Sequence, residues 1–136
     1  MSKQKAKYRR VKTPSGLQMD TVECGAVSLG IILSFFGKYL SIEKLRQDCD
    51  IGRDGSKASN ILKAGRLNQL KAKGYKAEVK DLYKVKFPAI IHWNFNHFLV
   101  LEGINQKYAF LNDPAVGKRK VTIDELSKAF TGVVDF

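Results

Sequence analysis

The spacing of apolar residues changes at Gly74, and this change limits the possible folds more than any other feature of the sequence. Before Gly74 the apolar residues recur at helical spacing, and after it they alternate along short runs rich in β-branched and aromatic residues. Helices that come first and strands that come afterwards are typical of an α+β domain with an antiparallel sheet. The sequence therefore predicts an N-terminal helical half packed on a C-terminal antiparallel β-sheet.

Three helices are predicted in the first half, over residues 23–36, 42–49 and 57–73. Gly37 can end the first helix in a left-handed conformation, Ser41 can cap the second, and Gly74 follows the third. The longest apolar run, residues 26–36, is much shorter than the roughly 20 residues that cross a bilayer. We therefore expect a soluble chain.

Five strand-like runs are predicted in the second half, over residues 75–79, 89–91, 97–101, 108–111 and 118–121. The third and fourth runs flank Asn105 and are expected to form a hairpin, whereas the fifth is expected to be an exposed edge strand. The segment Thr122-Ile123-Asp124-Glu125 matches a capping box, which predicts a last short helix that ends near Phe130.

The charge is concentrated at the N-terminus. The 136 residues carry a formal charge of +11, and the first twelve contribute six basic and no acidic residues. We expect residues 1–12 to form a basic flexible segment and residues 13–136 to form one domain. A basic segment can bind nucleic acid, which a salt-dependent shift assay would test, but phosphate loops, finger spacing and RNA-binding motifs are absent from the sequence. A nucleic-acid partner is therefore not expected.

The two cysteines, Cys24 and Cys49, form neither a metal-type pair nor a disulfide framework, and no signal peptide precedes them. This usage is typical of a reducing compartment, and neither a metal nor a cofactor is expected. Cys49 falls on the apolar face of the second helix, as a core residue would. Cys24 falls at the start of the first helix, where unpaired N–H groups and the helix dipole favour the thiolate. Cys24 is therefore the candidate nucleophile.

A side-chain amide lies shortly before this cysteine. Gln18 is six residues upstream of Cys24, so that its amide and the backbone N–H of Cys24 can share an oxyanion. The nearby acids Asp20 and Glu23 could be mistaken for an acid–base pair. We interpret them as acids favoured by the dipole at a helix N-terminus.

A cysteine nucleophile needs a base and a group that orients the base, and the sequence contains two histidines, His92 and His97. If the hairpin strands pair across a three- or five-residue loop centred on Asn105, the numbers of facing residues sum to 210, and His97 then lies opposite Asp113. A two-residue turn would instead place His97 against Pro114, and His92 cannot reach Asp113 in the first register. His97 is therefore the predicted base and Asp113 the predicted orienting carboxylate.

Three further residues are candidates for substrate binding. Trp93 lies near the predicted base, and an aromatic wall beside a thiol would narrow a subsite and exclude bulky side chains. Asn96 precedes His97 but also suits a turn, and Gly25 follows Cys24 directly.

Four sequence blocks occur in a recognisable order: Gln18 to Gly25, Pro88 to Ile91, Asn96 to Leu101, and Asn112 to Pro114 followed by Gly117. Together they resemble the N-terminal peptidase domain of peptidase-containing ABC transporters, the double-glycine leader peptidases that mature bacteriocins and related peptides. The resemblance extends from about Tyr8 to the C-terminus.

The resemblance implies a papain-like fold and a cysteine endopeptidase. Such an enzyme removes the leader of a bacteriocin or lanthipeptide precursor after a Gly-Gly or Gly-Ala pair, and the transporter exports the product. It implies Cys24 as nucleophile, His97 as base, Asp113 as orienting carboxylate and Gln18 as oxyanion donor. Two alternatives stay open, namely a non-catalytic leader-binding module and another papain-like reaction such as acyl transfer.

The same resemblance implies the partners and the location. We expect a precursor peptide with an amphipathic helical leader, and the membrane and ATPase domains of an ABC transporter, fused or separate. The chain is expected to be either an excised transporter domain or a stand-alone version, monomeric by itself, on the cytoplasmic side of the bacterial membrane.

Overall fold

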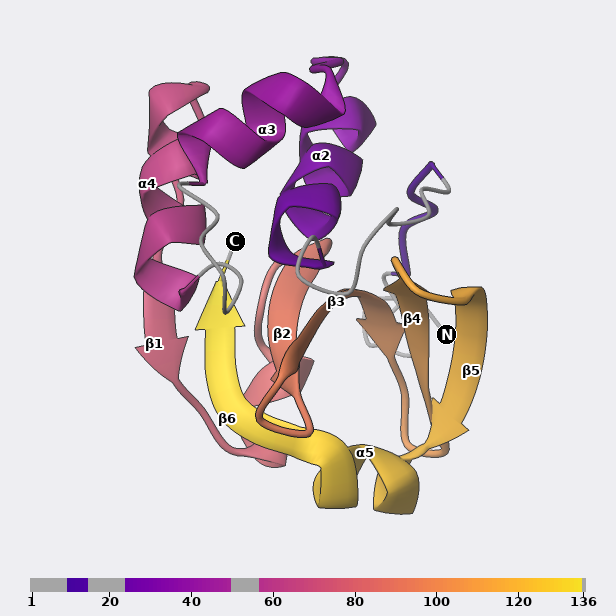
Figure 1. Ribbon diagram of the computed structural model, residues 1–136. Coiled ribbons are helices and arrows are strands. Elements are labelled where there is room, and N and C mark those ends of the chain that lie inside the picture. The colour runs from indigo at the N-terminus through magenta and orange to yellow at the C-terminus, as the bar shows by residue number, and fades with distance from the viewer. Residues whose placement is uncertain (1–9, 15–23, 50–56, 136) are drawn as a thin grey trace.

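The computed structural model describes residues 10–14, 24–49 and 57–135 (Figure 1). Its helices are α2 (Cys24–Phe35), α3 (Ile42–Asp48), α4 (Ala58–Leu67) and α5 (Ile123–Ala129), and a 3-10 helix spans Val79–Tyr83. Its strands are β1 (Gly74–Lys76), β2 (Ala89–Trp93), β3 (His97–Ile104), β4 (Tyr108–Asp113), β5 (Gly117–Thr122) and β6 (Phe130–Asp135).

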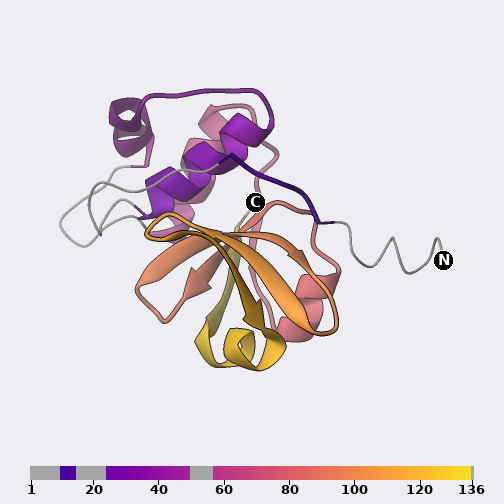
Figure 2. The same cartoon turned by 90° about the vertical axis from the view of Figure 1, so that its right-hand side faces the viewer.

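The strands form one antiparallel sheet in the order β1-β6-β2-β3-β4-β5. Helices α2, α3 and α4 lie on one face of this sheet, and α5 lies on the other (Figure 2). The core is divided in the same way, because successive residues of a strand point to opposite faces. Phe98 and Val100 of β3 pack with the helical layer, whereas Leu99 and Leu101 pack with Leu126 of α5. The predicted α+β class is confirmed.

Helix α2 is buried on nearly every side, with nine of its twelve residues inside the protein. A helix surrounded in this way needs apolar residues all round, which explains the continuous apolar run in the sequence. The predicted stop is confirmed, because Gly37 has a φ of +87° and the N–H of Lys38 donates to the carbonyl of Leu33 at 2.8 Å. In the described part of the chain, no helix has the length and apolar character that crossing a membrane requires.

Side-chain caps start α3 and α5 where the sequence predicts them. Ser41 Oγ accepts a hydrogen bond from the N–H of Lys44 at 3.2 Å. Thr122 Oγ1 accepts one from the N–H of Glu125 at 3.1 Å, and the Glu125 carboxylate accepts one from the N–H of Thr122 at 3.0 Å. These contacts satisfy N–H groups that the first turn of a helix leaves without partners.

The third helix is shorter than predicted. The sequence pattern predicts a helix to residue 73, but α4 ends at Leu67. Gln69 takes a left-handed conformation with a φ of +68°, and the N–H of Leu70 donates back to the carbonyl of Gly65 at 2.9 Å. This hydrogen bond closes the helix six residues early, so the helical spacing beyond it belongs to a loop.

Two strands also differ from the prediction. Strand β1 stops at Lys76 because the chain enters the 3-10 helix, which Glu78 and Asp81 open with reciprocal hydrogen bonds. Strand β6 was not predicted, since it follows α5 without a turn. Its local signals are the β-branched residues Thr131, Val133 and Val134 after Phe130, interrupted by Gly132, yet it lies between β1 and β2 inside the sheet.

The β3–β4 hairpin has a register different from the predicted one. Val100 pairs with Asn112, two residues further along β4 than the predicted partner. A bulge between Leu101 and Gly103 shifts the register again towards the turn. The predicted register is therefore wrong, because the turn is centred between Gln106 and Lys107 and not on Asn105, whose N–H donates to the carbonyl of Tyr108 at 2.9 Å.

Residues 10–14 run beside β3, and the N–H of Val11 donates to the carbonyl of Glu102 at 2.9 Å. Gly103 permits this approach, because a side-chain carbon there would lie 2.8 Å from Cα of Arg10. Of the segment expected to be flexible, residues 10–12 therefore lie against the sheet. We call residues 10–14 the N-terminal strap.

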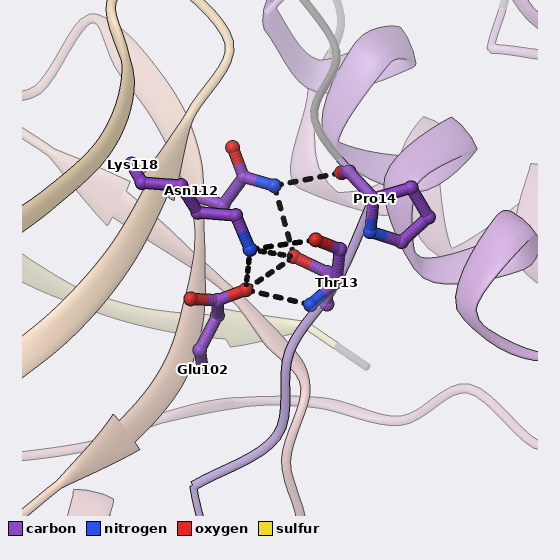
Figure 3. A network of polar contacts seen from close by, with 5 residues as sticks. All are labelled: Thr13, Pro14, Glu102, Asn112 and Lys118. Atoms are coloured by element: carbon purple, nitrogen blue, oxygen red, sulfur yellow. Dashed lines mark hydrogen bonds and ion pairs between the residues drawn. The ribbon is translucent and has the colours of Figure 1, made fainter.

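A buried polar network holds the strap (Figure 3). The Glu102 carboxylate accepts hydrogen bonds from the N–H and the hydroxyl of Thr13, at 2.7 and 2.6 Å, and pairs with Lys118. The side-chain amide of Asn112 donates to Thr13 Oγ1 at 2.9 Å and to the carbonyl of Pro14 at 2.8 Å. The network thus fastens the chain ahead of α2 to β3, β4 and β5.

Candidate active site

Cys24 lies where the helical layer meets the start of β3. It is the first residue of α2 and is 5% exposed. Its Sγ accepts a hydrogen bond from the backbone N–H of Phe98 at 3.3 Å, across 74 positions of sequence. The thiol of the front half therefore lies beside the strand that begins with His97.

His97 connects this thiol to a carboxylate. Its Nε2 lies 2.7 Å from Oδ1 of Asp113, the last residue of β4. The Cys24 side chain also influences the ionisation of this ring. Because Asp113 occupies Nε2, Nδ1 is the ring nitrogen available to the thiol.

The surroundings of His97 favour its protonated form. Burial lowers the pKa of His97, but the hydrogen bonds with Asp113 and Cys24, together with the charges of these two groups, raise it to about 9. Burial also acts against the charge of Asp113, yet hydrogen bonds from His97, Ala115 and Arg119 hold the pKa of Asp113 below its ordinary value. The pair therefore carries imidazolium and carboxylate at neutral pH.

Sequence reasoning missed one charged contact of this pair. Arg119 Nη1 lies 3.3 Å from Oδ2 of Asp113, and the N–H of Ala115 donates to Oδ1 at 2.9 Å. Arg119 lies on β5 opposite Leu111 and so within reach of the end of β4. The basic run around Arg119 looked like an exposed edge; pairing β4 with β5 across the intervening turn was the signal that could have located it.

Four other residues were predicted to belong to the site, namely Gln18, Trp93, Asn96 and Gly25. Gln18 lies outside the described residues. Trp93 is 6% exposed and packs in the core opposite the helical layer. Asn96 is exposed in the turn before β3, where its N–H donates to the carbonyl of Trp93 at 3.3 Å, and Gly25 is buried in the first turn of α2.

The second histidine has a different partner. His92 Nδ1 lies 2.7 Å from Oγ1 of Thr131, and its ring lies 4.8 Å from the ring of Phe98. Burial, and then the charge of His97, lower the pKa of His92, so it is neutral at pH 7. His92 therefore pairs with Thr131, whereas His97 pairs with Asp113.

Cys49 is fully buried among apolar residues, as predicted. Burial, with a smaller contribution from the charge of Asp48, raises the pKa of Cys49 to about 12. A thiol in this state does not ionise near neutral pH and is inert. Within residues 10–14, 24–49 and 57–135, His, Cys, Asp and Glu side chains form no metal-binding group.

The arrangement joins a thiol at a helix start, an imidazole and a buried carboxylate. An imidazole in this position can exchange a proton with the thiol, and the carboxylate fixes the orientation of the ring. Such a chain of groups supports nucleophilic attack by sulfur on a carbonyl carbon and protonation of the leaving group.

Comparisons with known proteins agree with this chemistry. The model of the peptidase C39 family matches residues 12–135. The probable microcin-H47 secretion/processing ATP-binding protein MchF of Escherichia coli is 32% identical over 127 residues, which cover 93% of this chain and 18% of that protein. The colicin V secretion/processing ATP-binding protein CvaB of Escherichia coli is 33% identical over 116 residues, covering 85% of this chain and 17% of CvaB. The chain thus spans about a fifth of the length of these relatives.

Solved structures show the same fold. A double glycine motif protease from an AMS/PCAT transporter, in complex with the leader peptide, superposes with a TM-score of 0.90 at 48% identity and covers 93% of this chain and 91% of its own. The peptidase domain of Streptococcus ComA superposes with a TM-score of 0.82 at 23% identity, over 89% of this chain and 94% of its own. The predicted papain-like architecture is thereby confirmed.

Proposed function

The chain belongs to the peptidase C39 family, and from this membership we propose that it is the cysteine endopeptidase of a bacteriocin or lanthipeptide exporter. It removes the leader of a precursor peptide after a Gly-Gly or Gly-Ala pair. The observation that carries the proposal is the meeting of Cys24, His97 and Asp113, whose side chains come from α2, β3 and β4. The double glycine motif protease, at 48% identity, supports the choice of substrate.

Cleavage begins at the sulfur. The Cys24 thiolate attacks the carbonyl carbon of the second small residue of the pair, while His97 holds the proton as imidazolium. The carbonyl π electrons move to oxygen, and the oxyanion lies against the backbone N–H of Cys24. We assign the second oxyanion donor to the Gln18 amide, as the sequence spacing predicts.

Collapse of this intermediate breaks the peptide bond. His97 gives its proton from Nδ1 to the departing nitrogen, which releases the mature peptide as an amine and leaves the leader as a thioester on Cys24. Water then attacks the thioester carbonyl while His97 takes a proton from this water. The carbon–sulfur bond breaks, which releases the leader as a carboxylic acid and returns Cys24 to the thiolate beside protonated His97. Asp113 keeps Nδ1 directed at the sulfur through both steps, because it holds Nε2.

Substrate contacts are assigned next to these groups. We propose that Trp93, Asn96 and Gly25 border the narrow part of the site, since each adjoins His97 or Cys24 in sequence or in the β2–β3 ladder. The leader ahead of the cut is proposed to dock as an amphipathic helix. The chain's net charge of +11 favours an acidic leader.

The partners follow from the relatives, which are secretion and processing ATP-binding proteins. We propose that the domain works beside the membrane and ATPase domains of such a transporter, on the cytoplasmic side of the membrane, and that it is monomeric by itself. Cleavage before export would release the mature peptide next to the transport channel.

The test is incubation with a precursor that carries a Gly-Gly leader, followed by mass spectrometry of the products. We expect two fragments whose masses place the cut after the second glycine, and no fragments with Cys24→Ala. Cys49→Ala is the matched control, because this buried thiol has no part in the mechanism and its loss should preserve cleavage. Binding of the precursor without cleavage would contradict the proposal and favour a leader-binding module.

A further inference from the structure

The two oxygens of the Asp113 carboxylate have different partners. Oδ1 contacts His97 Nε2 at 2.7 Å and accepts the N–H of Ala115 at 2.9 Å, whereas Oδ2 contacts Arg119 Nη1 at 3.3 Å. The Asp113 side chain is 4% exposed, so these contacts replace water rather than compete with it. The proposed mechanism uses only the first oxygen.

Arg119 is itself held in place. Its guanidinium carbon lies 5.9 Å from the centre of the Trp93 ring, and Trp93 pairs with His97 across the β2–β3 ladder. The Arg119 side chain is 38% exposed, which leaves its far side in water. The guanidinium therefore contacts the carboxylate and also lies within cation–π distance of the indole, and a planar cation suits both interactions.

We propose that Arg119 is a positioning residue that occupies Oδ2 of Asp113, so that the carboxylate presents only Oδ1 to His97 and keeps Nδ1 directed at Cys24. The proposal rests on the proposed function for the identity of the reaction, but its geometric content concerns the Cys24–His97 pair alone. Without this contact Oδ2 is no longer held, so the carboxylate keeps its hydrogen bond to Nε2 but holds the imidazole in a wider range of orientations.

The charge of Arg119 has a second effect. The titratable groups that face His97 are Cys24 from α2, Asp113 from β4 and His92 from β2. Arg119 adds a cation on the far side of Asp113, and this cation opposes protonation of His97. Its removal should therefore let His97 keep its proton to higher pH.

The test compares Arg119→Met with Lys120→Met. Lys120 is the next residue of β5 and lies over the Tyr108 ring at 4.3 Å, so its variant removes the same charge without touching Asp113. The measurement is the rate at which iodoacetate alkylates Cys24 as pH rises, because protonated His97 attracts this anion. The rate falls at high pH as His97 loses its proton, and we call this part of the rate–pH profile the alkaline limb. We expect its midpoint to rise by roughly 0.5–1 pH unit in Arg119→Met and to be unchanged in Lys120→Met.

Cleavage of the precursor gives the second readout. We expect kcat/KM at pH 7 to fall about tenfold in Arg119→Met, mostly in kcat, and to be unchanged in Lys120→Met. Arg119→Lys keeps the charge but loses the planar contact, so its limb should stay in place while its kcat falls. Arg119→Gln replaces Arg119→Met if the latter does not fold.

The link through Asp113 is tested in the Asp113→Asn background. There Arg119→Met should cause no further loss of kcat, since the carboxylate that it positions is gone. Fully multiplicative losses, or a limb that does not move in Arg119→Met or Arg119→Gln, would overturn the proposal. Failure of the wild-type protein to cleave any precursor would instead refute the proposed function, and the alkylation profile would still decide the role of Arg119.

Discussion

Asp113 contributes more than any other group to keeping His97 protonated. Burial opposes the imidazolium, and the hydrogen bond with Asp113 is the largest influence that favours it. A site that needs a protonated imidazole beside the thiol therefore depends on this contact for its pH range.

Asp113→Asn is predicted to narrow the pH range over which the precursor is cleaved. The variant replaces the charge of Asp113 with a neutral amide, so the pKa of His97 should fall from about 9 towards its ordinary value near 6.5. At pH 8 most His97 would then be neutral, and we expect kcat/KM to fall by about 10²-fold, with the alkaline limb moved to lower pH. The pH dependence of precursor cleavage measures both effects.

His92→Gln is the matched control for this prediction. His92 contacts Thr131 and is already neutral at pH 8, so its replacement should leave the limb where it is. A limb that stays near pH 9 in Asp113→Asn would show that groups other than this carboxylate hold the proton on His97.

Among the elements, those that end or begin through local signals were predictable. The caps Ser41 and Thr122 and the stop at Gly37 each depend on residues within four positions. The end of α4 is also local, but it depends on a left-handed Gln69, a conformation that this residue type does not signal. The course of β6 depends on pairing with β1 and β2, which are distant in sequence and which local spacing does not encode. The bulge in β3 belongs to the same class, since it lies where the strap crosses Gly103.

Helix α5 should depend on its cap. It has only seven residues, and Thr122→Ala removes the hydroxyl that accepts the N–H of Glu125. We expect the free energy of unfolding, measured by urea denaturation, to fall by about 1 kcal/mol, because the first turn of the helix loses a capping partner. Precursor cleavage at a temperature well below the transition should be unchanged, since α5 lies on the face of the sheet opposite α2.

Lys128→Ala in the same helix is the comparison for Thr122→Ala. Lys128 forms an exposed ion pair with Asp124, and such pairs contribute little. We expect its effect to stay below about 0.5 kcal/mol. Equal losses in the two variants would mean that the cap does not determine the stability of α5.

Across the whole molecule, two sets of polar contacts link the two halves of the chain in addition to the apolar packing of the helices on the sheet. One is the contact between Cys24 and β3, which builds the candidate site, and the other is the N-terminal strap. Sequence patterns indicated the pair His97 and Asp113 despite the wrong register. The two residues lie at the same end of one hairpin, because His97 begins β3 and Asp113 ends β4. The patterns did not identify the Glu102–Lys118 pair, because alternation alone does not identify which side chains meet across strands. Arg119 could have been located only by pairing β4 with β5, a step that the alternation of the run 118–121 does not supply.

The strap network should be the most sensitive polar feature of the fold. Glu102 is 0% exposed, and Lys118 is the only cation paired with it among the described residues. Lys118→Met leaves a buried carboxylate without its counter-charge, and we expect the free energy of unfolding at pH 7 to fall by about 3–5 kcal/mol. Lys80→Met, which breaks an exposed pair with Glu78, should cost less than about 1 kcal/mol.

Two further measurements test whether this loss of stability comes from the unpaired charge of Glu102. The double variant Glu102→Gln/Lys118→Met should recover most of the stability, because the neutral amide still accepts the hydrogen bonds of Thr13. In the wild type the pKa of Glu102 is held below its ordinary value, so its contribution is complete above about pH 4.5 and is lost as pH falls through the lowered value. In Lys118→Met burial raises that pKa instead, and the deficit relative to wild type should shrink as the pH approaches 5, since the carboxylate can then take up a proton. A deficit that is equally large at pH 5 and pH 7, or that persists in the double variant, would mean that Lys118 acts through packing and not through its charge.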